Sequence, residues 1–252
     1  FLPLIGVPYE NFHTTHESHL NVTNSTQQQE QQQSKLVCAK SAAAGMGALT
    51  DHGSGKIHGW DPHDYEIVHN QGRGKLLYDF RNYMLKNVGV PVKNVNTKAP
   101  FKIIISHMSS EHRVVMFGPQ YDALRNAFPE DEVEIVKLRM KDYSIEEQVR
   151  MVSEANIYIT ADGGGSVSGM FLPAGASMIV YYNDVGGQIY NRQVYTPAML
   201  DWDTHNNFSH LRVHWFPLGK QPGRSESDRD SESSLATLIV LVKHELELML
   251  MN

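Results

Sequence analysis

The sequence predicts an α/β fold in which a Rossmann-like parallel sheet carries helices on both faces. Short apolar runs suited to strands recur at residues 102–106, 133–138 and 157–160. Helical patterns lie between them, and the clearest is the capping box Ser144-Ile145-Glu146-Glu147. Three consecutive glycines follow the last of these runs. Strands that alternate with helices at this spacing favour a parallel sheet covered on both sides.

Apolar residues at helical spacing predict two helices that flank this region. The first runs from Leu76 to Leu85 and is stopped by Gly89 and Pro91. The second, Leu235 to Leu250, is apolar on much of its circumference, so we expect it to pack on the body of the protein. A further helix at residues 121–128 and a strand around Met178 complete the predicted series.

The composition indicates a globular protein and excludes several classes. The 252 residues are 41% hydrophobic, which allows a substantial core. A net charge of -6 and a pI near 6.1 remove the usual electrostatic basis for binding nucleic acid. Cys38 is the single cysteine, so an internal disulfide is excluded. No apolar run has the length of a membrane span.

Three glycosylation sequons, which begin at Asn21, Asn24 and Asn207, hint at the secretory pathway. The chain starts at Phe1 without a methionine, which is typical of a fragment or a processed form. We therefore expect membrane contact only through an anchor that is absent from this chain.

The glycine run is the strongest functional signal. Gly163, Gly164 and Gly165 follow a strand and precede a short helical start, so free amide groups there favour a phosphate or diphosphate. A tight connection with no ligand is the alternative interpretation. A dinucleotide fingerprint is disfavoured, because Pro173 and Gly175 end any helix after about two turns and that fingerprint needs a long helix.

Two other patterns suggest a metal less strongly than they suggest solvated loops. His13, His16 and His19 recur every third residue, but no carboxylate or cysteine is spaced to complete a ligand shell. Asp201 and Asp203 form an Asp-x-Asp pair that can in principle hold a divalent cation. We expect no metal site at either place.

Several motifs occur in an order that resembles glycosyltransferase family 61. They are Ile-Ser at the end of the strand at 103–106, Tyr-Ser-Ile-Glu-Glu-Gln at 143–148, the glycine turn, and Phe-Leu-Pro-Ala-Gly-Ala at 171–176. The Phe80-Arg81 helix upstream is similar to that of the family as well. The resemblance spans roughly residues 35–207 and is strongest between Ile103 and Tyr182.

The resemblance implies a GT-B architecture, in which two Rossmann-like domains face each other across a cleft. This chain would supply the C-terminal, nucleotide-sugar-binding domain, while its N-terminal domain would be incomplete. The implied domains are a flexible Gln-rich segment at 1–35, a partial acceptor-side region at 36–98, the nucleotide-sugar-binding domain at 99–218, a linker at 219–234 and a C-terminal helix at 235–252.

The implied enzyme is an inverting, metal-independent transferase of the Golgi or endoplasmic reticulum lumen. It needs no cofactor and uses a nucleotide sugar, most simply a UDP-sugar, as co-substrate. A glycan or protein hydroxyl would be the acceptor, and nucleic acid is not a partner. Chemically, such a reaction requires a base for the hydroxyl and positive charge or dipoles for the leaving diphosphate.

The residues expected to bind the donor are drawn from the ends of two predicted strands and the turns after them. They are Ser106, His107, Arg113, Asp162, Gly163, Gly164, Gly165 and Ser166.

Two positions in this set depart from the family pattern. Relatives usually have a histidine in the glycine loop, where this chain has Asp162, and commonly an arginine where it has His107. An ionised Asp162 would repel a phosphate, and it is the sole carboxylate that we place near the donor as a candidate base. A second hypothesis therefore stands beside the enzyme: an inactive, glycosyltransferase-like protein that binds a glycan or a partner.

Overall fold

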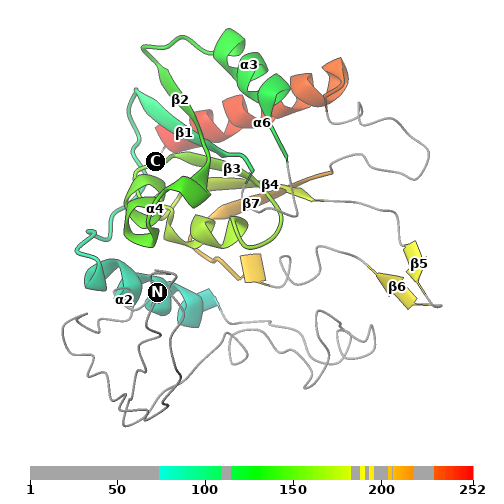
Figure 1. Ribbon diagram of the computed structural model, residues 1–252. Coiled ribbons are helices and arrows are strands. Elements are labelled where there is room, and N and C mark those ends of the chain that lie inside the picture. Colours follow the sequence, from blue (N-terminus) through cyan, green and yellow to red (C-terminus); the bar gives the residue numbers. More distant parts are fainter. Residues whose placement is uncertain are drawn as a thin grey trace, which may run out of the picture.

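The computed structural model describes residues 74–108, 115–182, 188–190, 193–195, 204–205, 207–217 and 230–251. Its main feature is a five-stranded, all-parallel sheet with the strand order β2-β1-β3-β4-β7 (Figure 1). The strands are β1 (Phe101–Ser106), β2 (Val133–Leu138), β3 (Ile157–Ala161), β4 (Ser177–Tyr182) and β7 (Arg212–Pro217). A small antiparallel hairpin of β5 (Gln188–Tyr190) and β6 (Gln193–Tyr195) lies outside the sheet.

Helices cover both faces of the sheet (Figure 1). They are α2 (Gly74–Asn87), α3 (Gly118–Ala127), α4 (Ile145–Val152) and α6 (Glu232–Leu250), with the short 3-10 helices η3 (Met140–Asp142) and η4 (Ser166–Phe171). Helices α3 and α6 pack together on one face, whereas α4, η4 and α2 lie on the other. This arrangement confirms the predicted α/β class and the parallel sheet with two covered faces.

The central strands are buried because nearly all their side chains are apolar. Every residue of β3 is buried, and Ile103, Ile104 and Ile105 of β1 are 0% exposed. The observed bounds of β1, β2 and β3 lie within one residue of the predicted runs. A continuous apolar run buried on both faces is the pattern that a parallel sheet requires.

The sequence patterns at the helix ends also appear in the structure. The Ser144 hydroxyl accepts from the Glu147 amide at 3.3 Å, and the Glu147 carboxylate accepts from the Ser144 amide at 2.7 Å, so the capping box at the start of α4 is confirmed. Gly89, with a φ of +66°, follows the end of α2.

Helix α2 belongs to the same hydrophobic core as the sheet. Leu77, Met84 and Leu85 are at most 4% exposed and join the cluster that includes the central strands. The Arg81 guanidinium is 1% exposed and donates to the carbonyl of Leu172 at 2.6 Å. Residues 74–87, which we had placed with the acceptor-side region 36–98, therefore share a core with the predicted domain at 99–218.

Helix α6 begins within the stretch predicted as a linker. Ser231 is its N-cap and accepts from the Ser234 amide at 3.3 Å, so residues 232–234 are helical. The sequence prediction placed them in the linker at 219–234, because serines and glutamate obscured the apolar period that starts at Leu235. The cap corrects that boundary.

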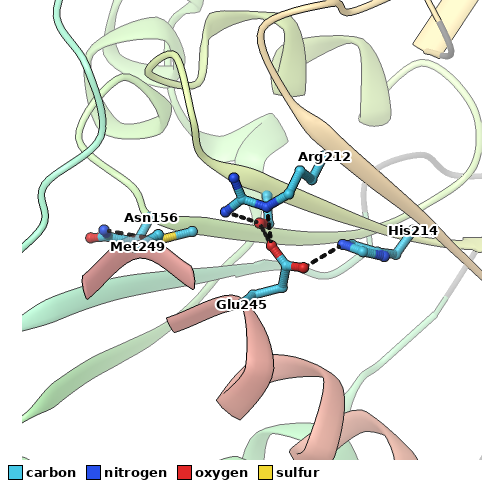
Figure 2. A network of polar contacts seen from close by, with 6 residues as sticks. Asn156, Arg212, His214, Glu245 and Met249 are labelled. Atoms are coloured by element: carbon cyan, nitrogen blue, oxygen red, sulfur yellow. Dashed lines mark hydrogen bonds and ion pairs between the residues drawn. The ribbon is translucent and has the colours of Figure 1, made fainter. Parts of the chain in front are cut away.

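A buried carboxylate attaches α6 to one edge of the sheet (Figure 2). Glu245 is 1% exposed, accepts from Arg212 Nε at 2.5 Å and from the Ser177 hydroxyl, and lies 3.0 Å from His214 Nε2. Burial alone would raise the pKa of Glu245, but hydrogen bonds from His214, Ser177 and Arg212 lower it to about 2. Ser177 and Arg212 are the first residues of β4 and β7, so we call this cluster of four residues the N-edge clamp.

Candidate functional site: a glycine turn at the carboxyl edge of the sheet

The predicted site residues that the structure describes gather at the edge of the sheet opposite the N-edge clamp. Ser106, the last residue of β1, pairs with Thr160 of β3. The His107 amide donates to the carbonyl of Leu138 at the end of β2, and the Asp162 amide donates to that of Tyr181 near the end of β4, each at 2.9 Å. Ser106-His107 and the glycine turn thus share one rim, as the parallel-sheet rule predicted.

The glycine turn closes on itself around one carbonyl group. Gly163 has a φ of +108°, a conformation that favours glycine. Its carbonyl accepts from the Ser166 amide at 2.9 Å and from the Ser166 hydroxyl at 2.6 Å. In a planar trans peptide the C=O and the following N–H point in opposite directions. Because the Gly163 carbonyl faces into the turn, the Gly164 amide points out of it.

Gly164 is exposed, and a Cβ added there would meet no atom within 4 Å. Within the part of the chain that the structure describes, the amides of Gly164 and Gly165 make no hydrogen bond. The Ser166 amide is used inside the turn, which differs from our expectation that it would face a ligand. Of the backbone amides that we expected to face a ligand, those of Gly164 and Gly165 are therefore available to bind an anion.

A buried tyrosine supports the turn from below. The Tyr158 hydroxyl donates to the Gly165 carbonyl at 3.0 Å. Burial raises the pKa of Tyr158 to about 12, so the hydroxyl keeps its proton and stays a donor at neutral pH.

A histidine that the sequence patterns did not single out completes the turn. His205 Nε2 lies 3.2 Å from the Ser166 hydroxyl oxygen. The His205 ring is 0% exposed and contacts the rings of Phe208 and Trp215, whose centroids are 5.1 and 5.8 Å away. Burial lowers its pKa to about 3, so the imidazole is neutral at physiological pH. No spacing motif links Ser166 and His205, because they are 39 residues apart in the chain.

Two of the predicted polar residues are largely withdrawn from solvent. Asp162 is 3% exposed and Ser106 is 1% exposed. An acceptor hydroxyl would have to reach the Asp162 carboxylate through this covering for Asp162 to act as a base. Their roles in donor binding stay predictions.

Positive charge at the rim comes from the end of β2. Burial, followed by the charges of Lys137 and Arg139, lowers the pKa of His107 and thereby favours its neutral form. Arg139 Nε lies 3.5 Å from Asp142, and Lys137 lies 5.0 Å from the centre of the Tyr121 ring. Arg113, the cation predicted from the sequence, lies outside the described residues.

The two metal patterns of the sequence, His13-His16-His19 and Asp201-Asp203, lie outside the described residues. In the ranges that the structure does describe, no three His, Cys, Asp or Glu side chains gather as metal ligands would. In the same ranges, none of the helices combines the length and the apolar character that crossing a bilayer demands.

Comparison with known proteins bears out the resemblance read from the motifs. The family model of glycosyltransferase 61 matches residues 64–179, a little under half of the chain, and this match includes the glycine turn. Residues 64–179 are thus similar to glycosyltransferase family 61.

Among solved structures, the crystal structure of the glycotransferase of kitacinnamycin is similar at 13% identity and a TM-score of 0.30. The match covers 64% of this chain and 42% of that one, so this chain spans less than half of its length. No curated protein matches the sequence.

Proposed function

We propose that this protein is a glycosyltransferase that moves a sugar from a nucleotide-sugar donor, most simply a UDP-sugar, to a hydroxyl group of a glycan or protein. The observation that carries the proposal is the outward-facing Gly164 amide on an open rim of a family 61 domain. Departure of a nucleoside diphosphate develops negative charge, and amide dipoles fixed beforehand stabilise such charge. The turn supplies them without a side chain that blocks close approach.

Inversion at the anomeric carbon and independence from metal ions are parts of the same proposal. Inversion requires direct attack by the acceptor hydroxyl on the anomeric carbon as the bond to the diphosphate breaks, with the hydroxyl proton passing to a base. The turn amides, helped by the cationic end of β2, would take the place of a metal on the diphosphate. Anomeric configuration of the product by NMR, and activity in the presence of a chelator, test these two parts.

The site of action in the cell is proposed from the same activity. Glycan and protein acceptors of this kind are modified in the Golgi or endoplasmic reticulum lumen, which agrees with the sequons in the chain. In the third sequon, Asn207 is half-buried and Ser209 is exposed. Loss of mass on enzymatic deglycosylation of the secreted protein would support this localisation, and an unglycosylated cytosolic product would contradict it.

The direct test is calorimetric titration with UDP, using Gly164→Val as the variant. The added side chain fits the empty space beside Gly164, so the fold should survive while an isopropyl group covers the approach to the amide. We expect at least a tenfold loss of UDP affinity, or about 1.4 kcal/mol. His244→Val places the same side chain on the exposed surface of α6, next to Glu245, and should bind UDP like the wild type.

Two outcomes would contradict the proposal. The first is a wild-type protein that shows no heat with UDP or other nucleoside diphosphates and no thermal stabilisation at high concentration. A true ligand at 100 times its dissociation constant would add about 2.7 kcal/mol of stability. The second is tight binding that Gly164→Val leaves unchanged. Binding of UDP with no sugar transfer to any hydroxyl acceptor would instead favour the inactive binding protein.

A further inference from the structure

A relay of three groups fixes the direction in which the glycine turn presents its amides. The Ser166 hydroxyl donates its only proton to the Gly163 carbonyl. His205 Nε2, which is 3.2 Å from the same oxygen, must therefore carry the hydrogen and donate to it. The order of the relay is His205 Nε2–H, the Ser166 hydroxyl and the Gly163 carbonyl. Hydrogen bonds arranged in a chain in this way strengthen one another.

The other nitrogen of His205 shows that the residue adds little to stability. With Nε2 protonated in the neutral ring, Nδ1 is an acceptor, and it finds no partner among the described residues. Leaving a buried acceptor without a partner typically costs more free energy than one ordinary hydrogen bond contributes. The single bond from Nε2 therefore does not offset the cost of the unpaired nitrogen, and the reason for a histidine here lies outside the stability of the core.

The surroundings of His205 make it suited to holding a fixed direction. Phe208 and Trp215 lie on the ring at the distances given above, so the imidazole cannot turn freely. Without a donor at position 205, the Ser166 hydroxyl would lose the hydrogen bond that reaches it from the segment before β7. Rotation of that hydroxyl would release one of the two bonds that close the turn on the Gly163 carbonyl.

We propose that His205 is a positioning residue for the nucleotide site: through Ser166 it holds the Gly163 carbonyl inward and thereby keeps the Gly164 amide directed at the diphosphate of the donor. This inference rests on the proposed function for its ligand, although the relay itself is independent of any ligand. His205 does not contact the donor, because its ring is fully covered.

Two substitutions at position 205 separate positioning from packing. His205→Leu has a similar volume and removes the donor, while the Ser166 hydroxyl keeps the Gly163 carbonyl as its partner. His205→Gln keeps an N–H at a similar distance from the backbone. If His205 positions the turn, hydrogen exchange at the Ser166 amide should rise about tenfold in His205→Leu, which corresponds to about 1.4 kcal/mol of local opening, and return toward wild type in His205→Gln.

Three further measurements complete the test. The global midpoint of unfolding in urea should stay at the wild-type value or rise in His205→Leu, because an unpaired buried nitrogen has been removed. UDP affinity should fall roughly tenfold in the same variant and recover in His205→Gln. In a double-mutant cycle, Ser166→Ala should remove most of the effect of His205→Leu, because the two residues act through one relay.

Unchanged exchange at the Ser166 amide in His205→Leu would overturn the inference. So would faster exchange spread evenly over the strands, since that result would assign His205 to the general stability of the core. A wild-type protein that fails to bind UDP, but whose turn loosens in His205→Leu and recovers in His205→Gln, would refute the proposed donor and leave the relay standing.

Discussion

The two edges of the sheet are built in opposite ways. At the N-edge clamp, the buried charge of Glu245 is met by Arg212, Ser177 and His214, so its oxygens are satisfied within the chain (Figure 2). At the carboxyl edge, the amides of Gly164 and Gly165 have no partner among the described residues. A satisfied network stabilises one arrangement of the chain, whereas unpaired donors on a fixed turn are available to a ligand.

The two edges also differ in charge, since the N-edge clamp holds an ionised carboxylate and the glycine turn is backed by a neutral histidine. Glu245 stays ionised because its partners are positive or donate hydrogen bonds. His205 behind the turn, and His210 just before β7, are kept neutral chiefly by burial, which lowers their pKa values to about 3 and about 4. The neutral imidazole of His205 adds no charge of its own behind the turn amides.

Acid sensitivity is the largest effect expected from this difference. The unfolded chain protonates His205 and His210 near their usual pKa of 6.5, while the folded protein resists protonation until about 3 and 4. The unfolded state thus binds more protons, so stability is complete above about pH 6.5 and falls as the pH is lowered toward 4. Each histidine contributes a slope of at most about 1.4 kcal/mol per pH unit.

Urea unfolding at pH 7, 5.5 and 4 measures this slope, and His205→Gln should make it less steep. The pKa of Glu245 is lowered from 4.5 to about 2, so the clamp keeps its contribution above pH 4.5 and loses it only as the pH falls toward 2. A stability that does not change between pH 6.5 and pH 5 would show that the two histidines are not held neutral.

Breaking the clamp should give the next largest effect. Glu245→Ala removes the carboxylate to which Arg212 Nε and the Ser177 hydroxyl donate, and leaves Arg212 only its bond to the Ser177 oxygen at 3.2 Å. We expect a loss of about 3 kcal/mol, at the lower end of the range for breaking a buried pair, because the Arg212 side chain is 30% exposed and regains some water. Glu247→Ala, on the exposed side of α6, should change stability by less than about 0.5 kcal/mol.

The same pair of variants tests whether the two edges are independent. UDP affinity at the rim should remain near wild type in Glu245→Ala, once the measurement is made at a temperature where the variant is folded. Urea unfolding and calorimetry on one protein preparation provide both numbers. A large loss of UDP affinity at unchanged folding would mean that the clamp controls the rim, contrary to the separation described here.

The sequence predicts the sheet well because its signals are local. Apolar runs of β1, β2 and β3, and the capping box at Ser144, depend on residues that are neighbours in the chain. The shared rim of His107 and the glycine turn follows from a general property of parallel sheets. Each of these predictions needs only the order of the elements.

Features that depend on distant contacts were missed. Strand β7 did not stand out because Arg212 and His214 interrupt its apolar pattern, and the structure shows that both side chains serve Glu245 on α6. His205 was missed for the same reason, because its partner Ser166 is 39 residues away in the chain. The sequence predicts that the Ser166 amide faces a ligand. In the structure this amide donates to the Gly163 carbonyl, a closure of the turn that no local pattern indicates.

The smallest expected effect contrasts two glycines of the same segment. A Cβ added to Gly169 would lie 2.5 Å from Met178 Sδ, inside the contact between η4 and β4, whereas one added to Gly164 meets nothing within 4 Å. Gly169→Ala should therefore cost about 1–3 kcal/mol of stability as Met178 shifts to make room. Gly164→Ala should stay within about 0.5 kcal/mol of wild type, because its methyl group projects into open space. Urea unfolding of the two variants side by side measures the difference. Equal losses would indicate that the turn is as closely packed as η4, in which case a diphosphate could not approach the Gly164 amide.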